Sequence, residues 1–234
     1  MTVVRFIADD DDFAPRNRAS GCWCELAPGH LDFAGRPALF LDRDGVIVED
    51  TGYACSAEDA HVLAGAAAAI ARCNTLRVPV IVVSNQSGIA RGLYDWNGFA
   101  AVQGVIEDAL AAAGARLDAV FACAHHGDGR APLNIADHPW RKPNPGMIVD
   151  AASRMALDLP RSWIAGDRAS DMAAGKAAGL AGGILILSSN LPAESAAAIP
   201  LRSKDFAVEV VASLTEAVEL LLARGAFTET QPVP

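Results

Sequence analysis

Short apolar runs divide this chain, and most of them end in polar or glycine-bearing turns. Residues 38–42 begin with four apolar side chains and end at Asp42. The run is too short for a helix and is typical of a strand that is buried on both faces of a parallel sheet. Similar runs predict further strands at 79–83, 118–123, 162–165, 183–187 and 206–211.

Segments with helical spacing separate these runs. They predict helices at 58–76, 95–113, 144–156, 170–178 and 213–224, the second of which stops at Gly114. Strands that alternate with helices indicate a parallel sheet whose two faces are both covered. We therefore predict an α/β fold: a three-layer, Rossmann-like parallel sheet with helices on both faces.

The regular alternation begins only at residue 38. Residues 1–37 contain four consecutive aspartates and show neither a helical nor a strand period, so we predict an N-terminal arm with one short strand at 2–7. Residues 38–225 are predicted to form the main domain, and the polar residues 226–234 a tail. The loop over residues 124–143 is long for a compact domain, which indicates a functional or flexible segment.

Composition narrows the class of protein. The 52% hydrophobic content is sufficient for a sizeable core, and the net charge of −9 without a basic stripe argues against a nucleic-acid partner. The start of the chain is too short and too acidic for a signal peptide, and no run reaches the length of a membrane span. The cysteines are five in number and scattered, so we predict a reducing cytoplasm and no disulfide framework.

Polar groups follow several of the predicted strands. In a parallel sheet their carboxyl ends meet at one edge, where ligands bind. The carboxylates favour Mg²⁺, and the serine and lysine suit a phosphate group. One carboxylate can act as a nucleophile and a second as an acid and base, although an Asp-x-Asp pair is also typical of a solvated turn. The residues concerned are Asp42, Asp44, Ser84, Asn85, Arg141, Lys142, Asp167 and Asp171.

The order of four motifs resembles the haloacid dehalogenase (HAD) superfamily of phosphatases. The match runs over about residues 38–190 and is close to the capless branch that contains D-glycero-D-manno-heptose 1,7-bisphosphate phosphatases and histidinol-phosphate phosphatases. Its motifs here are Asp42-Arg43-Asp44-Gly45-Val46, Ser84-Asn85-Gln86-Ser87-Gly88, Arg141-Lys142-Pro143 and Gly166-Asp167-Arg168-x-x-Asp171.

The resemblance implies a role for each matching residue. Asp42 would be the nucleophile that becomes an aspartyl-phosphate, and Asp44 the general acid and base. The phosphate would be bound by Ser84, Asn85 and Lys142, the rest of the substrate by Gly52, Tyr53 and Arg141, and Mg²⁺ by Asp42, Asp167 and the backbone carbonyl of Asp44. Two alternatives stay open: Asp171 is a metal ligand or supports Asp167, and Tyr53 contacts substrate or only packs.

The implied activity is Mg²⁺-dependent hydrolysis of a small phosphorylated metabolite. A heptose bisphosphate is the first candidate and histidinol phosphate the second; a non-catalytic binding module and a phosphotransferase are the alternatives. The spacing of the motifs leaves no room for a large cap domain, which favours hydrolysis because water reaches an open site. The oligomeric state stays open.

One part of the chain departs from that branch. Its members often carry a structural zinc in the long loop, bound by Cys-x-His and a later Cys-x-Cys. Here Cys123-Ala124-His125 is present, but His138-Pro139-Trp140 replaces the second pair, one ligand short of the usual four. Cys22 and Cys24 would complete the set if the arm folded over the loop, but we favour the alternative that they are incidental. We therefore predict no structural zinc and a loop that is tethered by Trp140 and Ile135.

Overall fold

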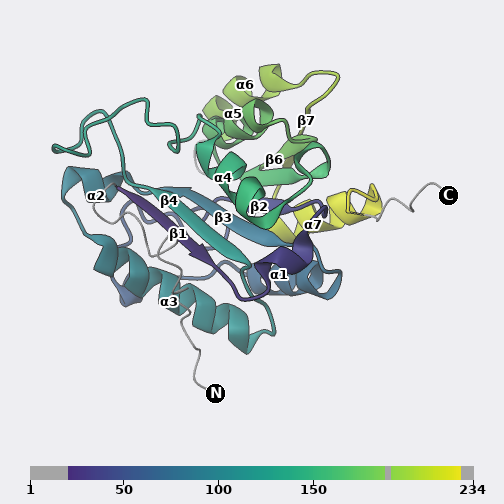
Figure 1. Ribbon diagram of the computed structural model, residues 1–234, viewed down its shortest axis with the longest axis horizontal. Helices are drawn as coiled ribbons and strands as arrows, with labels where there is room; N and C mark the ends of the chain where they lie inside the picture. Colours follow the sequence, from purple (N-terminus) through teal and green to yellow (C-terminus); the bar gives the residue numbers. More distant parts are fainter. Residues whose placement is uncertain (1–20, 188–190, 228–234) are drawn as a thin grey trace.

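The computed structural model describes residues 21–187 and 191–227 (Figure 1). The strand predicted at 2–7 lies outside the described residues. The described part contains a seven-stranded sheet in the order β1-β4-β3-β2-β5-β6-β7. All neighbouring strands are parallel except β1, which runs antiparallel to β4. The strands are β1 (Cys22–Leu26), β2 (Leu39–Leu41), β3 (Val80–Asn85), β4 (Ala119–Cys123), β5 (Trp163–Gly166), β6 (Gly182–Ile186) and β7 (Ala207–Val211).

Helices cover both faces of this sheet, as predicted (Figure 1). In β2, Leu39 and Leu41 belong to the core on the side of α1, α3 and α7, whereas Phe40 belongs to the core under α4 and α5. This alternation follows from the period of two along a strand and gives a core on each face. The helices are α1 (Ala66–Thr75), α2 (Ser87–Arg91), α3 (Trp96–Ala112), α4 (Gly146–Met155), α5 (Ala169–Ala178), α6 (Leu191–Ala198) and α7 (Leu214–Ala223).

The longest helix shows how local sequence sets its limits. The Asp95 carboxylate accepts hydrogen bonds from the backbone N–H groups of Asn97 and Gly98, which caps the start of α3. Phe99, Val102, Ile106 and Leu110 are then buried at helical spacing. The helix ends just before Gly114, which has a positive φ of 72°.

The helix predicted over 58–76 is wrong in its first half. Only a 3₁₀ turn (Ala57–Asp59) forms there, and α1 begins at Ala66. Val62 instead makes a β-bridge with Val48, and Gly65 adopts a φ of 81°. The bridge uses backbone groups that a helix would need, so the helix can start only after Gly65. The short helices α2 and α6 were not predicted.

The N-terminal segment also differs from the prediction. We found no strand period in residues 22–26, yet they form β1, the edge strand of the sheet. Because β1 is only half-buried, it carries no continuous apolar run that would predict it. The described residues of the predicted arm thus contribute a strand to the sheet, while the boundaries of arm, domain and tail stay predictions.

No large cap interrupts the described sheet. Between β2 and β3 the chain forms only a 3₁₀ turn and α1, and between β3 and β4 only α2 and α3. None of the helices in residues 21–187 and 191–227 combines the length and the apolar character that crossing a membrane requires. The edge at the carboxyl ends of the central strands is therefore shaped by loops.

Candidate active site

Three neighbouring strands bring the predicted polar residues to one edge of the sheet. Asp42 follows β2 directly, Ser84 and Asn85 end β3, and Asp167 follows β5. The strands β3, β2 and β5 are adjacent and parallel, so their carboxyl ends share an edge. The sequence-based expectation that these residues converge is confirmed in the structure.

Lys142 connects this group from the long loop. Its Nζ lies 3.1 Å from Asp42 Oδ1 and 2.5 Å from Asp171 Oδ1, and it donates to the Val83 carbonyl at 2.8 Å. The side chain is 2% exposed. Burial opposes its charge, yet Asp171 and Asp42 together raise the pKa of Lys142 above the ordinary value. Lys142 therefore remains a cation at neutral pH.

Asn85 holds the backbone of Lys142 in place. Its Nδ2 donates to the Lys142 carbonyl at 2.9 Å, and its Oδ1 accepts from the Lys142 N–H at 3.0 Å. This pair of bonds links the end of β3 to the loop 57 residues later. Asn85 thus positions the lysine; direct binding of phosphate by its side chain stays a prediction.

A cluster of buried carboxylates provides oxygen ligands for a hard cation. Asp42, Asp167 and Asp171 each offer an oxygen, and these oxygens lie within 4.8 Å of one another. Burial, and then the charges of Asp42 and Asp171, raise the pKa of Asp167 to about 7. Burial also raises the pKa of Asp42, although Lys142 opposes this shift. A bound divalent cation would offset this repulsion, so the donor set fits Mg²⁺.

The geometry favours one of the two alternatives for Asp171. Its Oδ1 faces Lys142, and its Oδ2 accepts from the backbone N–H of Arg168 at 3.0 Å. The side chain is completely buried. Asp171 therefore acts as the counter-ion of Lys142 and braces the turn that carries Asp167.

Asp44 lies in a hydrogen-bond network that was not foreseen from the sequence. Gln86 Nε2 donates to Asp44 Oδ2 at 2.9 Å and to Ser84 Oγ at 2.8 Å. Arg43, buried over the ring of Phe99, donates to Asp44 Oδ1 at 3.1 Å. The Tyr94 hydroxyl donates to Gln86 Oε1 at 2.5 Å. Gln86 belongs to the second motif, and this position in the sequence could have indicated that it has a role in the site.

The rim of the site carries the residues expected to contact substrate. Tyr53 is 44% exposed and lies over Gly88, where an added Cβ would come within 2.8 Å of its ring. Gly52 lies in the same exposed loop, and its N–H donates to Asp50. Arg141 is half-buried and donates to the His125 carbonyl at 3.0 Å. The contacts of Gly52, Tyr53 and Arg141 with substrate stay predictions.

Positive charge concentrates beside Arg141. Burial lowers the pKa of Arg141, and the nearby charges of Arg91 and Arg168 lower it further. Arg168 forms an ion pair with Asp50 at 3.1 Å, and Arg91 Nη2 lies 3.1 Å from His126 Nε2. This basic rim stands out in a chain whose net charge is −9. Such a rim suits a second anionic group on the substrate.

The long loop is tethered by one of the two predicted residues. Trp140 packs against Phe121 of β4, with ring centroids 5.5 Å apart. Ile135 is 44% exposed, so its predicted role as a tether is wrong. The residues around Ile135 lie on the solvent side of the loop, where no core surface is available to bury its side chain.

Comparison with known proteins gives matches that agree with this geometry. A family model described as HAD-hydrolase-like matches residues 139–217. The chain is 51% identical over 166 residues to a D-glycero-beta-D-manno-heptose-1,7-bisphosphate 7-phosphatase from Mesorhizobium japonicum; the match covers 71% of this chain and 76% of the relative.

Solved structures give the same result. A crystal structure described as a HAD-like phosphatase from Mesorhizobium loti is 42% identical, with a TM-score of 0.78, and the match covers 90% of this chain and 97% of the other. A D,D-heptose 1,7-bisphosphate phosphatase from B. bronchiseptica, complexed with magnesium and phosphate, is 32% identical with a TM-score of 0.70, covering 80% and 99%.

Proposed function

Because this chain belongs to the HAD-like hydrolases and is a phosphatase, we propose that it removes the 7-phosphate of D-glycero-β-D-manno-heptose 1,7-bisphosphate. The observation that carries the proposal is the position of Asp42 at the end of β2, with Lys142 Nζ at 3.1 Å and Asp167 beside it. The named activity of the 51% identical relative supports the choice of substrate.

We propose that the enzyme requires Mg²⁺, bound by Asp42, Asp167 and the backbone carbonyl of Asp44. Three observations support this: the buried carboxylates, the raised pKa of Asp167, and the magnesium in the related B. bronchiseptica structure. When bound, the ion supplies positive charge that stabilises the transferring phosphoryl group.

In the first step, the Asp42 carboxylate attacks phosphorus and the bond from phosphorus to the sugar oxygen breaks. Asp42 becomes an aspartyl-phosphate, and Asp44, in its protonated form, gives its proton to the departing oxygen. Lys142 lies next to the attacking carboxylate, so its charge stabilises the phosphoryl oxygens in the transition state. Gln86 and Arg43 hold the carboxylate of Asp44 in one orientation.

In the second step, water attacks the phosphorus of the aspartyl-phosphate. Asp44, now a carboxylate, takes the proton from that water, and phosphate leaves as the Asp42 carboxylate re-forms. The side chain of Asp44 is 27% exposed, so water can reach it. The absence of a cap between the described strands keeps that path open.

The second phosphate of the substrate would bind at the basic rim. The positive charge there comes from the guanidinium groups of Arg141, Arg91 and Arg168. This local positive charge contrasts with the net charge of −9 of the whole chain. Guanidinium groups bind phosphate through paired hydrogen bonds. A sugar with two phosphates should therefore bind more tightly than the same sugar with one.

The test is phosphate release from the purified protein with Mg²⁺. We expect the heptose bisphosphate to lose its 7-phosphate, which ³¹P NMR can monitor. The kcat/KM for this substrate should exceed the kcat/KM for heptose 7-phosphate and for histidinol phosphate. An Arg141→Ala variant should lose most of the preference for the bisphosphate and keep its rate on the monophosphate. Faster hydrolysis of histidinol phosphate would contradict the proposed substrate.

The metal requirement is tested separately. EDTA should abolish turnover, and added Mg²⁺ should restore it; full activity after exhaustive chelation would contradict the assignment.

A cytoplasmic location stays a prediction, and none of the five cysteines forms a disulfide in the structure.

A further inference from the structure

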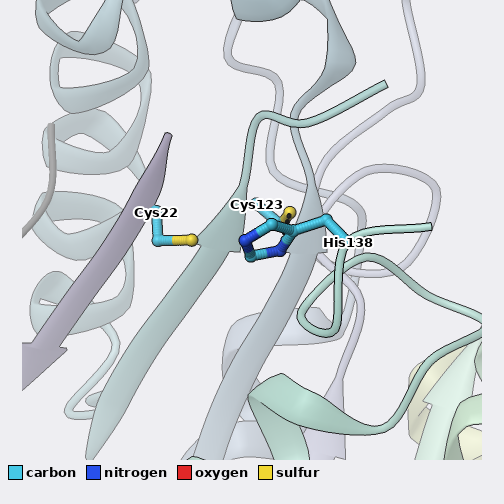
Figure 2. A group of neighbouring side chains, drawn as sticks. All are labelled: Cys22, Cys123 and His138. Atoms are coloured by element: carbon cyan, nitrogen blue, oxygen red, sulfur yellow. Dashed lines mark hydrogen bonds between the residues drawn. The ribbon is translucent and has the colours of Figure 1, made fainter. Parts of the chain in front are cut away.

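A second cluster of potential metal ligands lies at the β1 edge of the sheet. Cys22, Cys123 and His138 each offer a ligand atom, and these atoms lie within 4.8 Å of one another. Figure 2 shows the sulfur atoms of both cysteines beside the imidazole ring of His138. The residues come from β1, from the end of β4, and from the loop before Lys142.

The pairing of β1 with β4 brings the two thiols together. Cys22 lies directly opposite Cys123 in the antiparallel register, so both side chains point to the same face of the sheet. Cys123 is fully buried and Cys22 is 9% exposed. The start of β1 also lies close to the long loop, because Gly21 has no side chain: a Cβ there would come within 2.7 Å of His125 and 2.5 Å of Leu133.

His138 presents a nitrogen to this pair. Its Nδ1 lies 3.7 Å from Cys123 Sγ and accepts the backbone N–H of Trp140 at 3.2 Å. A nitrogen that accepts a hydrogen bond carries a lone pair, which is the form of imidazole that binds metals. A bound cation would accept this lone pair, and the hydrogen bond from the Trp140 N–H would be lost.

We propose that Cys22, Cys123 and His138 bind a zinc-type divalent cation. Two thiolates and an imidazole are soft or borderline ligands, which select zinc over the magnesium of the carboxylate cluster. The related branch takes all its zinc ligands from the long loop, whereas here the N-terminal strand supplies one. The predicted absence of a structural zinc treated Cys22 as incidental, whereas the β1–β4 register places Cys22 beside Cys123.

Among the described residues the site offers three protein ligands, so a bound ion would have a fourth position open to water. His125 offers a further imidazole, but its ring lies parallel to that of His138, with centroids 3.9 Å apart and planes at 7°. A metal lies in the plane of the imidazole that binds it, and two parallel, separated planes share no such point. His125 therefore packs on the ligand instead of joining it.

The bound ion would link two parts of the active-site framework. His138 lies four residues before Lys142, and Cys22 lies in the edge strand. Removing the ion should therefore free the part of the loop around His138 without changing the carboxylate cluster. Faster proteolysis within residues 124–140 should accompany loss of the metal.

The experiment measures the metal content of protein purified without chelators. The protein is dialysed first against buffer that contains zinc and then against zinc-free buffer, which removes unbound metal. We expect about one zinc per chain in the wild type and in Cys24→Ser, and less than about a tenth of that in Cys22→Ser. Cys24 is the matched control because it lies two residues along the same strand and outside the cluster.

A second readout is the absorption of the cobalt-substituted protein. Co²⁺ added to metal-free wild type should give thiolate charge-transfer and tetrahedral d–d bands, which excess Mg²⁺ leaves unchanged. If Cys22→Ser or Cys123→Ser fails to fold, His138→Asn takes their place as the test variant. It should weaken the cobalt bands. Any of three outcomes would overturn the proposal. The wild type could be free of metal after dialysis, Cys22→Ser could retain zinc, or Cys22 and Cys123 could form a disulfide in the resting protein.

Discussion

The described part of the chain contains two ligand clusters of opposite chemistry, both connected to the loop over residues 124–143. The carboxylate cluster lies at the ends of the central parallel strands and contains its own counter-ion, Lys142. The cluster of Cys22, Cys123 and His138 lies at the antiparallel edge and contains no lysine or arginine.

This difference shows how each cluster is stabilised. Buried carboxylates repel one another, so the first cluster needs the buried lysine and, in our proposal, a hard cation. Thiols and a neutral imidazole are tolerated in a core without any charge, so the second cluster can assemble before a metal binds. Charge thus governs the first site, whereas strand pairing governs the second.

The largest effect should come from Asp42→Asn, which removes the proposed nucleophile. We expect kcat to fall by at least about 10³-fold with the fold intact, measured by phosphate release and circular dichroism. Asp108→Asn, the same change on the exposed face of α3, is the control. More than a few per cent of residual rate would remove Asp42 from this role.

Lys142→Met tests whether the carboxylate cluster depends on its internal counter-ion. It leaves Asp42 and Asp171 buried and unpaired, so the free energy of unfolding in EDTA should fall by about 3–5 kcal/mol. Urea denaturation gives the value, and Lys204→Met, at an exposed position, is the control. A loss below about 1 kcal/mol would show that the carboxylates are tolerated without the lysine.

Gly45→Ala tests how closely the cation site is packed. Gly45 has a φ of 79°, and a Cβ there would come within 2.8 Å of Asp167 Oδ2. Displacing this carboxylate should weaken Mg²⁺ binding by about 10–100-fold, measured from the Mg²⁺ dependence of turnover. Gly114→Ala has a similar φ of 72° and no neighbour within 4 Å, so it controls for backbone strain alone. Equal effects on Mg²⁺ binding would refute the steric argument.

The smallest effect should come from Trp140→Ala, which loosens the loop that joins the clusters. Loss of the contact with Phe121 should lower stability by about 1–2 kcal/mol and raise KM more than it lowers kcat, because Arg141 and Lys142 follow directly. Thermal melts and steady-state kinetics test this. Ile135→Ala, in the same loop but 44% exposed, should change neither measurably.

The sequence alone determined the central strands and the residues of the first site. Strands such as β2 and β3 are buried on both faces, so their apolar runs are continuous, and each run leads directly into its polar residues. Parallel pairing then places Asp42 and Asp167 at one edge whatever the details of the loops. The four motifs add the resemblance that identified the family.

Only the tertiary structure decided how the remaining side chains are partnered. The pairing of Lys142 with Asp171, and of Asn85 with the Lys142 backbone, joins segments 29 and 57 residues apart, and local pattern carries no information about such contacts. The same holds for β1: an edge strand buries one side only partly, so it leaves no clear period in the sequence. Its register against β4 brings Cys22 to Cys123 across 101 residues of chain, and that register is set by packing in the folded sheet.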